Sequence, residues 1–254
     1  MRQPFHIPFR AGAIARAVRV LPTIDAARAL EALRLPPFRG VIVMHGGAGG
    51  MSPDDVRAVR GALIAGLAPV AERDRLLVID GGTRAGAMQA MGEARAAVGG
   101  TYPLLGVCPA GAVSYPGGPA PSEERAPLDA GHSHFLLVEG DQFGVESRLL
   151  VGLLRASGKP GLALIVNGGE IVERELEAHL AQASPVIVLG GSGRLADLLA
   201  DPASEARAAL PAAARFDTVD VAAPDALRAR LERLLAQPPS TGASWWSRRS
   251  APTT

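Results

Sequence analysis

Cysteine and lysine are almost absent from this chain of 254 residues: Cys108 is its only thiol, and Lys159 is the only lysine among 26 basic residues. A lone thiol excludes an internal disulfide framework and a metal site built from several cysteines. No apolar run approaches the ~20 residues that span a bilayer, and the opening segment MRQPFHIPFRAG lacks the apolar core of a signal peptide. The composition therefore predicts a cytoplasmic protein with no membrane insertion.

An excess of charge of one sign is also absent, since 26 Lys and Arg stand against 25 Asp and Glu, for a net charge of +1. Such a balance gives no bulk attraction to nucleic acid or to acidic membranes, so no nucleic-acid partner is expected. Hydrophobic residues make up 48% of the chain. That share, at this length, is enough for one large α/β domain with a substantial core.

Several catalytic motifs are missing as well. Lys159 is followed by proline rather than by the Ser or Thr of a Walker loop, and there is no GxSxG elbow of an α/β-hydrolase. The histidines of His132-Ser133-His134 have no carboxylate or cysteine at ligand spacing, so we predict no metal site. Cys108 ends an apolar run with no base beside it, which favours a buried thiol over a nucleophile.

Five apolar runs that end in glycine organise the chain, and a helical pattern usually follows each. They are Val41–Gly47, Leu76–Gly82, Phe135–Gly140, Leu162–Gly169 and Val186–Gly191. Continuous Val, Ile and Leu are typical of strands buried on both faces of a parallel sheet. In open α/β sheets the ligand crevice lies outside the carboxyl ends of the strands. The pattern predicts a Rossmann-like, doubly wound, mainly parallel sheet of about seven strands, with its ligand at the glycine loops.

The predicted domain covers residues 39–236, after an N-terminal extension, 1–38. In the extension, Ile14–Val20 is compatible with an edge strand. A tail, 237–254, carries Trp245 and Trp246 and is rich in Pro, Ser and Thr, which predicts disorder. The loop over Pro109–Gly131 is long for a compact domain and is a candidate lid.

Two glycine loops carry chemical information beyond the turn itself. His45-Gly46-Gly47-Ala48-Gly49 fails the GxGxxG pattern, because Ser52 stands where the third glycine belongs. Its backbone N–H groups and the helix that follows would still stabilise an anion. In the second loop, which begins at Asp80, Thr83 can cap a helix or bond a phosphate oxygen, and Arg84 can contact a phosphate or remain solvated. For both loops the alternative, that the glycines serve only the fold, stays open.

Several segments, in the same order across Val41 to Ala200, resemble a known domain. They are GGTRAGAMQAM, LLGVCPAG, LDAGHSHFLLVEG, FGVESRLL, LIVNGG and PVIVLGGSGRLADLLA. The chain resembles the SLOG domain of TRPM cation channels, and more closely its stand-alone prokaryotic form, LSDAT. The resemblance implies a Rossmann-like fold, a nucleotide-derived ligand such as ADP-ribose, and assembly into a homo-oligomer, with the downstream effector left open. No other cofactor is implied.

The wider superfamily includes LOG-type enzymes, which hydrolyse the N-glycosidic bond of nucleoside monophosphates and carry PGGxGTxxE after a helix with an arginine. Here Gly168, Gly169 and Glu175 match that motif, and Arg148 could match the arginine. Asn167, Ile171 and Val172 replace its Pro, third Gly and Thr. A hydrolase is therefore the alternative to a non-catalytic sensor, with Glu175 and Arg148 as its catalytic residues. A third alternative is an interaction module without a ligand.

The favoured prediction is a sensor whose glycine loops hold the phosphates, whose arginines supply charge, and whose Asp80 or Glu170 accepts hydrogen bonds from ribose hydroxyls. The predicted ligand-binding residues are His45, Gly46, Gly47, Asp80, Gly81, Gly82, Thr83, Arg84, Gly86, His134, Gly168, Gly169, Glu170, Gly190, Gly191, Ser192 and Arg194.

Overall fold

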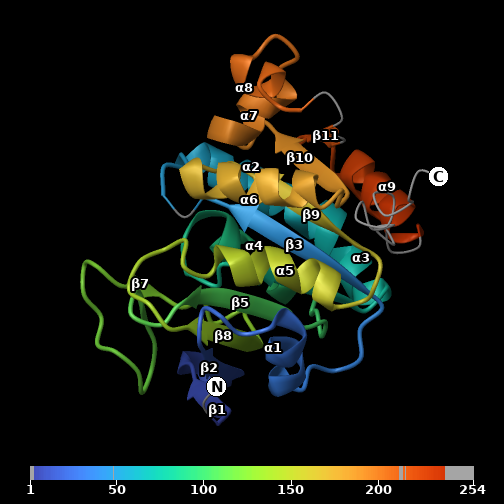
Figure 1. Ribbon diagram of the computed structural model, residues 1–254. Helices are drawn as coiled ribbons and strands as arrows, with labels where there is room; N and C mark the ends of the chain where they lie inside the picture. The colour runs from blue at the N-terminus through green and yellow to red at the C-terminus, as the bar shows by residue number, and fades with distance from the viewer. Residues whose placement is uncertain (1–2, 48, 212–213, 215, 238–254) are drawn as a thin grey trace, which may run out of the picture.

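A nine-stranded sheet forms the centre of the computed structural model, which describes residues 3–47, 49–211, 214 and 216–237 (Figure 1). Its strands lie in the order β1-β2-β8-β5-β4-β3-β9-β10-β11. They are β1 Phe5–Pro8, β2 Ile14–Val20, β3 Gly40–Gly46, β4 Leu76–Asp80, β5 Leu104–Pro109, β8 His134–Val138, β9 Gly161–Val166, β10 Val186–Gly190 and β11 Asp217–Asp220. Only the β1–β2 pair is antiparallel. The predicted doubly wound, mainly parallel architecture is confirmed.

The direction of winding reverses at β3. From β3 the chain adds β4, β5 and β8 on one side, and then returns to place β9, β10 and β11 on the other. Val43 of β3 is therefore paired with Ile79 of β4 on one side and with Ala163 of β9 on the other. The crevice beyond the carboxyl ends of β3 and β9 is the topological switch point, where ligands bind in this class of sheet.

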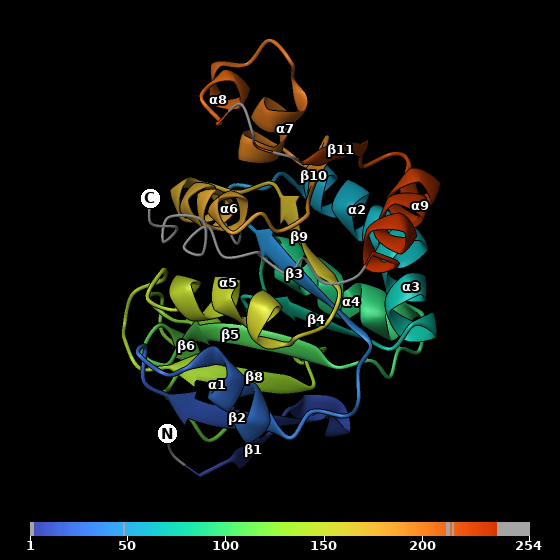
Figure 2. The ribbon, with the colours of Figure 1, turned by 45° about the vertical axis from the view of Figure 1, so that its right-hand side comes forward.

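Helices cover both faces of the sheet. They are α1 Ala26–Leu33, α2 Pro53–Ala62, α3 Ala68–Arg73, α4 Gly86–Ala97, α5 Ser147–Ala156, α6 Glu170–Ala181, α7 Arg194–Ala200, α8 Glu205–Ala208 and α9 Pro224–Leu235, with a 3₁₀ turn at Arg10–Gly12. The helices α2, α3, α4 and α9 bury their apolar residues against one face, whereas α1, α5, α6 and α7 pack on the other. Figure 2 shows α5 and α6 on the opposite side of β3 from α3 and α4. None of the helices in the described ranges has the length and apolar character needed to cross a membrane.

The helix predicted after the first glycine loop begins where its capping residues place it. Ser52 accepts a hydrogen bond from the Asp55 N–H, and the Asp55 carboxylate accepts one from the Ser52 N–H, which is a capping box with Pro53 at the first helical position. A π turn at Leu63–Leu67 then joins α2 to α3. The helical segment therefore continues to Arg73.

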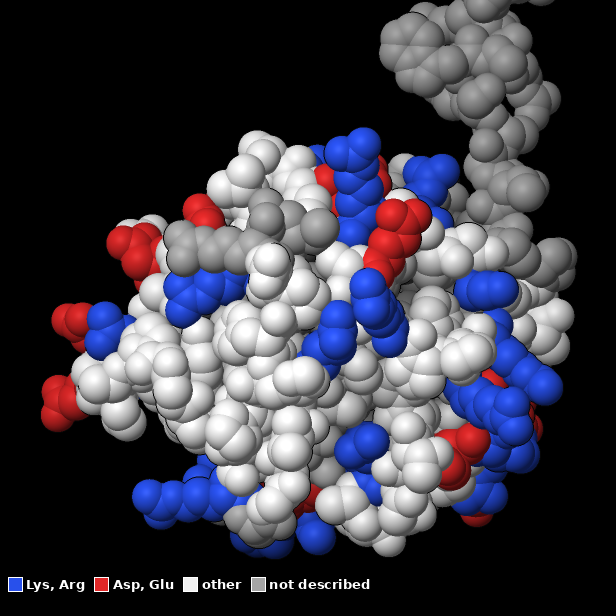
Figure 3. Space-filling view, turned by 90° about the horizontal axis from the view of Figure 1, so that it is seen from below, with Lys and Arg blue, Asp and Glu red and all other residues white. Residues whose placement is uncertain are grey.

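The predicted N-terminal extension contributes two strands to the same sheet. Strand β2 pairs in parallel with β8, and β1 forms the edge beside it. The face at this end of the molecule carries basic side chains that are scattered among uncharged ones rather than gathered into one patch (Figure 3). The predicted tail, including Trp245 and Trp246, lies outside the described residues apart from Gln237.

The long loop over Pro109–Gly131 is packed onto the sheet. It contains the short parallel pair of β6, Val113–Ser114, and β7, Ala126–Pro127, and Leu128 forms a bridge with Thr83. Val113 and Tyr115 are buried in an apolar cluster with Phe135, and Cys108 is fully buried in the same cluster. Burial raises the pKa of the Cys108 thiol well above its usual range, as the prediction of an inert thiol requires.

Candidate functional site

A cavity of about 450 Å³ opens beyond the carboxyl ends of β3 and β9, at the switch point of the sheet. We call it the strand-end cavity. Its described lining residues are Met44, His45, Gly46, Gly47, Gly49, Gly81, Thr83, Met88, Phe143, Glu146, Leu150, Gly169, Glu170, Ile171, Val172, Glu175 and Arg194. Glycine loops after β3, β4 and β9 form one side, while α5 and α6 supply apolar and acidic side chains.

The glycine loops approach one another so closely that side chains would not fit between them. A Cβ at Gly47 would collide with the side-chain oxygen of Asn167, which lies in the loop after β9. Asn167 in turn donates to the carbonyl of Ser192 at 2.8 Å, and its own N–H donates to the Ser192 hydroxyl at 2.8 Å. Asn167 and Ser192 are fully buried. They therefore brace the loops after β9 and β10 from within.

Arg194 supplies the positive charge at the rim of the strand-end cavity. It is the first residue of α7 and has a left-handed backbone, with φ of 52°, a conformation that costs a non-glycine residue free energy and is concentrated at functional sites. Its guanidinium donates to the Gly49 carbonyl at 3.2 Å and lies 2.6 Å from where a Cβ on Gly169 would be. Within the described part of the chain, no acidic group pairs with it.

Thr83 places a hydroxyl group in the cavity wall with no hydrogen-bond partner among the described residues, although its side chain is 1% exposed. The capping alternative for Thr83 is wrong, because Ala85 is the N-cap of α4 and no side chain caps that helix. A buried hydroxyl without a partner is costly unless a ligand or water meets it.

Glu175 lies in the cavity wall at the end of a buried hydrogen-bonded series. One carboxylate oxygen accepts from the Ser147 hydroxyl at 2.5 Å, and the other is 2.7 Å from Nδ1 of His45. Nε2 of His45 is 2.8 Å from Nε2 of His179. Burial, followed by the proximity of His45, lowers the pKa of His179 to about 3, so that this imidazole is neutral at pH 7. The hydrogen bonds are satisfied when His179 donates to His45 and His45 donates to Glu175.

Glu146 is the second buried carboxyl group in the cavity wall. It occupies the N-cap position of α5, and one of its oxygens accepts from the Gly144 N–H at 2.8 Å. Burial and, to a smaller extent, the nearby Glu175 raise its pKa to about 7, against the lowering effect of backbone N–H donors. Glu146 and Glu175 thus line the same cavity in different environments.

A second buried network lies directly behind the loop after β4. His132 is placed between two carboxylates, 2.8 Å from Asp80 and 3.1 Å from Asp129. Full burial alone would lower the pKa of His132, but Asp80 and Asp129 raise it to about 9. The imidazole is therefore charged at pH 7 and donates to both carboxylates. Asp80 also accepts from the Gly82 N–H at 2.7 Å, which holds the loop that carries Thr83.

A family model described as "SLOG in TRPM, prokaryote" matches residues 39–229, which is most of the chain.

The chain belongs to this family.

The predicted resemblance to the prokaryotic SLOG family is thereby confirmed. Among solved structures, the X-ray structure of TM1055, a structural genomics target, aligns with a TM-score of 0.54 at 18% sequence identity. The alignment covers 76% of this chain and 99% of that chain. At this identity the likeness shows the fold alone.

The structure brings one part of the predicted SLOG-domain site together around the strand-end cavity. This part comprises His45, Gly46, Gly47, Gly81, Thr83, Gly169, Glu170 and Arg194, with Glu175 from the hydrolase alternative. They come from separate elements and meet only because the carboxyl ends of β3, β4, β9 and β10 lie at one edge of the sheet.

The other predicted residues lie outside the described lining: Asp80, Gly82, Arg84, Gly86, Gly168, Gly190, Gly191, Ser192, His134 and Arg148. Asp80 and Ser192 use their side chains internally. Arg84 lies in the wall of a separate hollow beside the Pro109–Gly131 loop. His134 begins β8, half-buried, where burial and the nearby Arg16 and Arg95 lower its pKa to about 4.

Some lining residues had no signal that single-sequence reasoning could use. Glu146 stands alone before a helix, and nothing local marks it as buried. Met44 and Met88 continue apolar patterns that predict core packing. Residues 45 and 175 are 130 positions apart, and their hydrogen bond depends on how β3 and α6 pack.

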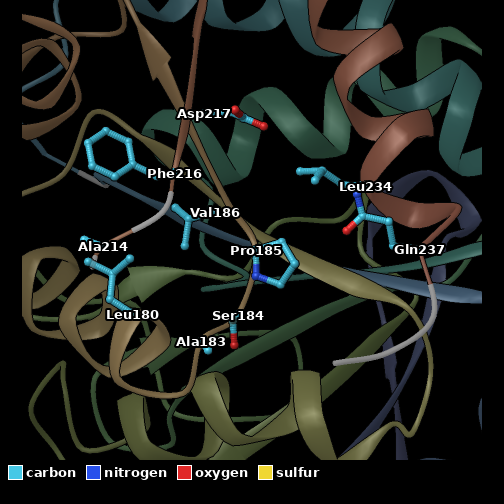
Figure 4. A pocket seen from close by; sticks show the side chains of 10 residues that line it. All are labelled: Leu180, Ala183, Ser184, Pro185, Val186, Ala214, Phe216, Asp217, Leu234 and Gln237. Carbon is cyan, nitrogen blue, oxygen red and sulfur yellow. The ribbon is translucent and has the colours of Figure 1, made fainter. Parts of the chain in front are cut away.

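Another hollow, of about 580 Å³, lies at the opposite ends of the strands (Figure 4). Leu180, Val186, Phe216 and Leu234 point into it from α6, β10, the segment before β11 and α9. Its carboxylate, Asp217, is already paired with Arg230 and Arg233. The described residues that line this hollow include neither a glycine loop nor an unpaired charge, so the strand-end cavity is the candidate functional site.

Proposed function

We propose that this SLOG-family chain binds a nucleotide-derived ligand, such as ADP-ribose or a related nucleotide, in the strand-end cavity. The observation that carries the proposal is Arg194: its guanidinium has no acidic partner among the residues that the structure describes, and it is held over the Gly49 and Gly169 loops at the switch point. Glycine loops expose backbone N–H groups, and α6 begins immediately after Gly169. These groups together favour an anion such as a phosphate.

The rest of the cavity fits the remainder of a nucleotide. Met44, Met88, Phe143 and Leu150 supply apolar surface for a base. The exposed Glu170, at the rim, can accept hydrogen bonds from ribose hydroxyls. A volume of about 450 Å³ lies within the range of small-molecule sites, which is roughly 300–1,000 Å³.

A thermal-shift panel of AMP, ADP, ATP, NAD, ADP-ribose and cyclic nucleotides tests the proposal. A ligand present at 100 times its Kd stabilises the fold by about 2.7 kcal/mol, which corresponds to a rise of roughly 5–10 °C in Tm for a chain of this size. Arg194→Gln should abolish most of the shift, whereas Arg84→Gln, outside the cavity, should retain it. The absence of a shift with every nucleotide would contradict the proposal.

Hydrolysis of a nucleotide N-glycoside is a second candidate, because Glu175 is 5% exposed and lies in the cavity wall. A fixed carboxylate there can stabilise the positive charge that develops on a sugar ring. Chromatography of the same nucleotide incubations distinguishes the candidates. Release of free base that disappears in Glu175→Gln would establish the hydrolase, and stabilisation without release supports the sensor.

A further inference from the structure

The two carboxyl groups of the strand-end cavity differ in the kind of donor that they meet. Both oxygens of Glu175 accept a hydrogen bond, one from Ser147 and one from His45. Glu146 accepts from the backbone N–H groups of Gly144 and of Glu146 itself, and no described side chain donates to it. The carboxyl group of Glu175 is thus engaged by side chains on both oxygens, whereas that of Glu146, 6% exposed in the cavity wall, is held by the backbone alone.

We infer that Glu146, in its protonated form, is the hydrogen-bond donor of the strand-end cavity, and that it recognises an acceptor atom of the ligand such as a ring nitrogen of a nucleobase. The inference rests on the proposed nucleotide binding and assigns a direction to the ligand. The base lies toward Glu146 and the apolar wall, and the phosphates lie toward Arg194 and Gly169.

The groups that face Glu146 favour the protonated form of its carboxyl group. Glu175, which lies on α6, repels a second negative charge at Glu146. The buried Cys108 thiol on β5 is neutral and does not offset this repulsion. His45, Glu170 and Arg194 are the other titratable or charged groups of the described lining. Arg194 is bound to the Gly49 carbonyl. Burial and Glu175 accordingly raise the pKa of Glu146 to about 7, so that the proton is lost within an experimentally convenient range.

Calorimetric titration with ADP-ribose from pH 6 to pH 9 tests this role. Its pyrophosphate is a diester with no group that titrates in this range. If binding needs the proton on Glu146, the Kd rises tenfold per pH unit well above the pKa of the free protein, or about 50-fold between pH 7 and pH 9. Glu146→Gln keeps an N–H donor without a titrating proton, so its Kd should stay near the value of the wild type at pH 6 and be independent of pH.

Glu170→Gln is the matched control, because it removes a carboxylate from the exposed rim of the same cavity. This variant should retain the pH dependence of the wild type. A Kd of the wild-type chain that is constant from pH 6 to pH 9 would overturn the inference. Loss of binding in Glu146→Gln at every pH, with an unchanged Tm, would overturn it as well.

A measurement without ligand separates this inference from the proposed function. Infrared difference spectra during a pH titration should show a protonated carboxyl group that disappears around pH 7, and this band should be missing in Glu146→Gln. If the band titrates as expected but no nucleotide binds, the protonation of Glu146 stands and nucleotide binding fails. If nucleotides bind but no such band exists, nucleotide binding stands and the donor role of Glu146 fails.

Discussion

The buried imidazolium of His132 should make the stability of the protein depend on pH between neutral and alkaline conditions. The pKa of His132 is raised from 6.5 to about 9 by Asp80 and Asp129. A group with a raised pKa in the folded state contributes its full stabilisation below the unfolded pKa of 6.5 and loses it as the pH rises through about 9. At roughly 1.4 kcal/mol per pKa unit, this shift contributes about 3 kcal/mol to the free energy of unfolding.

Urea unfolding, followed by circular dichroism at pH 7 and pH 9, measures this contribution. The free energy of unfolding should fall by about 2 to 3 kcal/mol over that interval in the wild type. His132→Gln should be less stable at pH 7, because two buried carboxylates lose their cation, and should show little further loss at pH 9. His134→Gln is the control, since the pKa of His134 is lowered to about 4 and this imidazole stays neutral throughout. The same decrease in wild type and His132→Gln would refute the reasoning.

Three further predictions concern the stability of the fold. Gly82→Ala should destabilise the fold by more than about 3 kcal/mol in urea, because its Cβ would lie 2.7 Å from the Gly106 Cα at a φ of 69°; Gly99→Ala, with φ of 60° but nothing within 4 Å, should cost only about 1 kcal/mol. Ser52→Ala removes the cap of α2 and should lower the free energy of unfolding by about 1 kcal/mol. Because the pKa of His179 is lowered to about 3, its buried neutral ring makes the fold less stable as the pH falls below 6.5, and the loss from pH 7 to pH 4 should be smaller in His179→Gln.

The central strands were predictable because burial on both faces leaves a simple mark on the sequence. Runs such as Val41–Gly47 and Leu162–Gly169 have no alternation, and they became neighbouring parallel strands. Strand β2, Ile14–Val20, has arginines between its apolar residues, and β1 is four residues long. Such segments are compatible with a strand, but only pairing with β8 makes β2 an internal member of the sheet.

The candidate site was predictable only in so far as it depends on backbone. Glycine loops at strand ends placed Gly47 and Gly169 at the cavity because the fold itself puts strand ends together. The side-chain chemistry depends on packing between distant elements. The LOG-type motif singled out Glu175, yet its burial and its bond to His45 follow from the way α6 packs against β3. Ser192 shows the converse, since a hydroxyl in a glycine loop is used for bracing.

The two residues of the hydrolase alternative are separated by the geometry of α5. Glu146 and Leu150 both line the strand-end cavity. Arg148 is two positions from each of them, which is about 200° around a helix of 3.6 residues per turn. It therefore faces outward, exposed, and donates to the carbonyl of Ile24. The helix presents an acid to the cavity where the LOG-type motif has an arginine, and the guanidinium comes from Arg194 on the other side of the switch point. If the proposed nucleotide binds here, its anionic groups should lie toward α7, with Glu146 and Glu175 left for the neutral or cationic end of the same molecule.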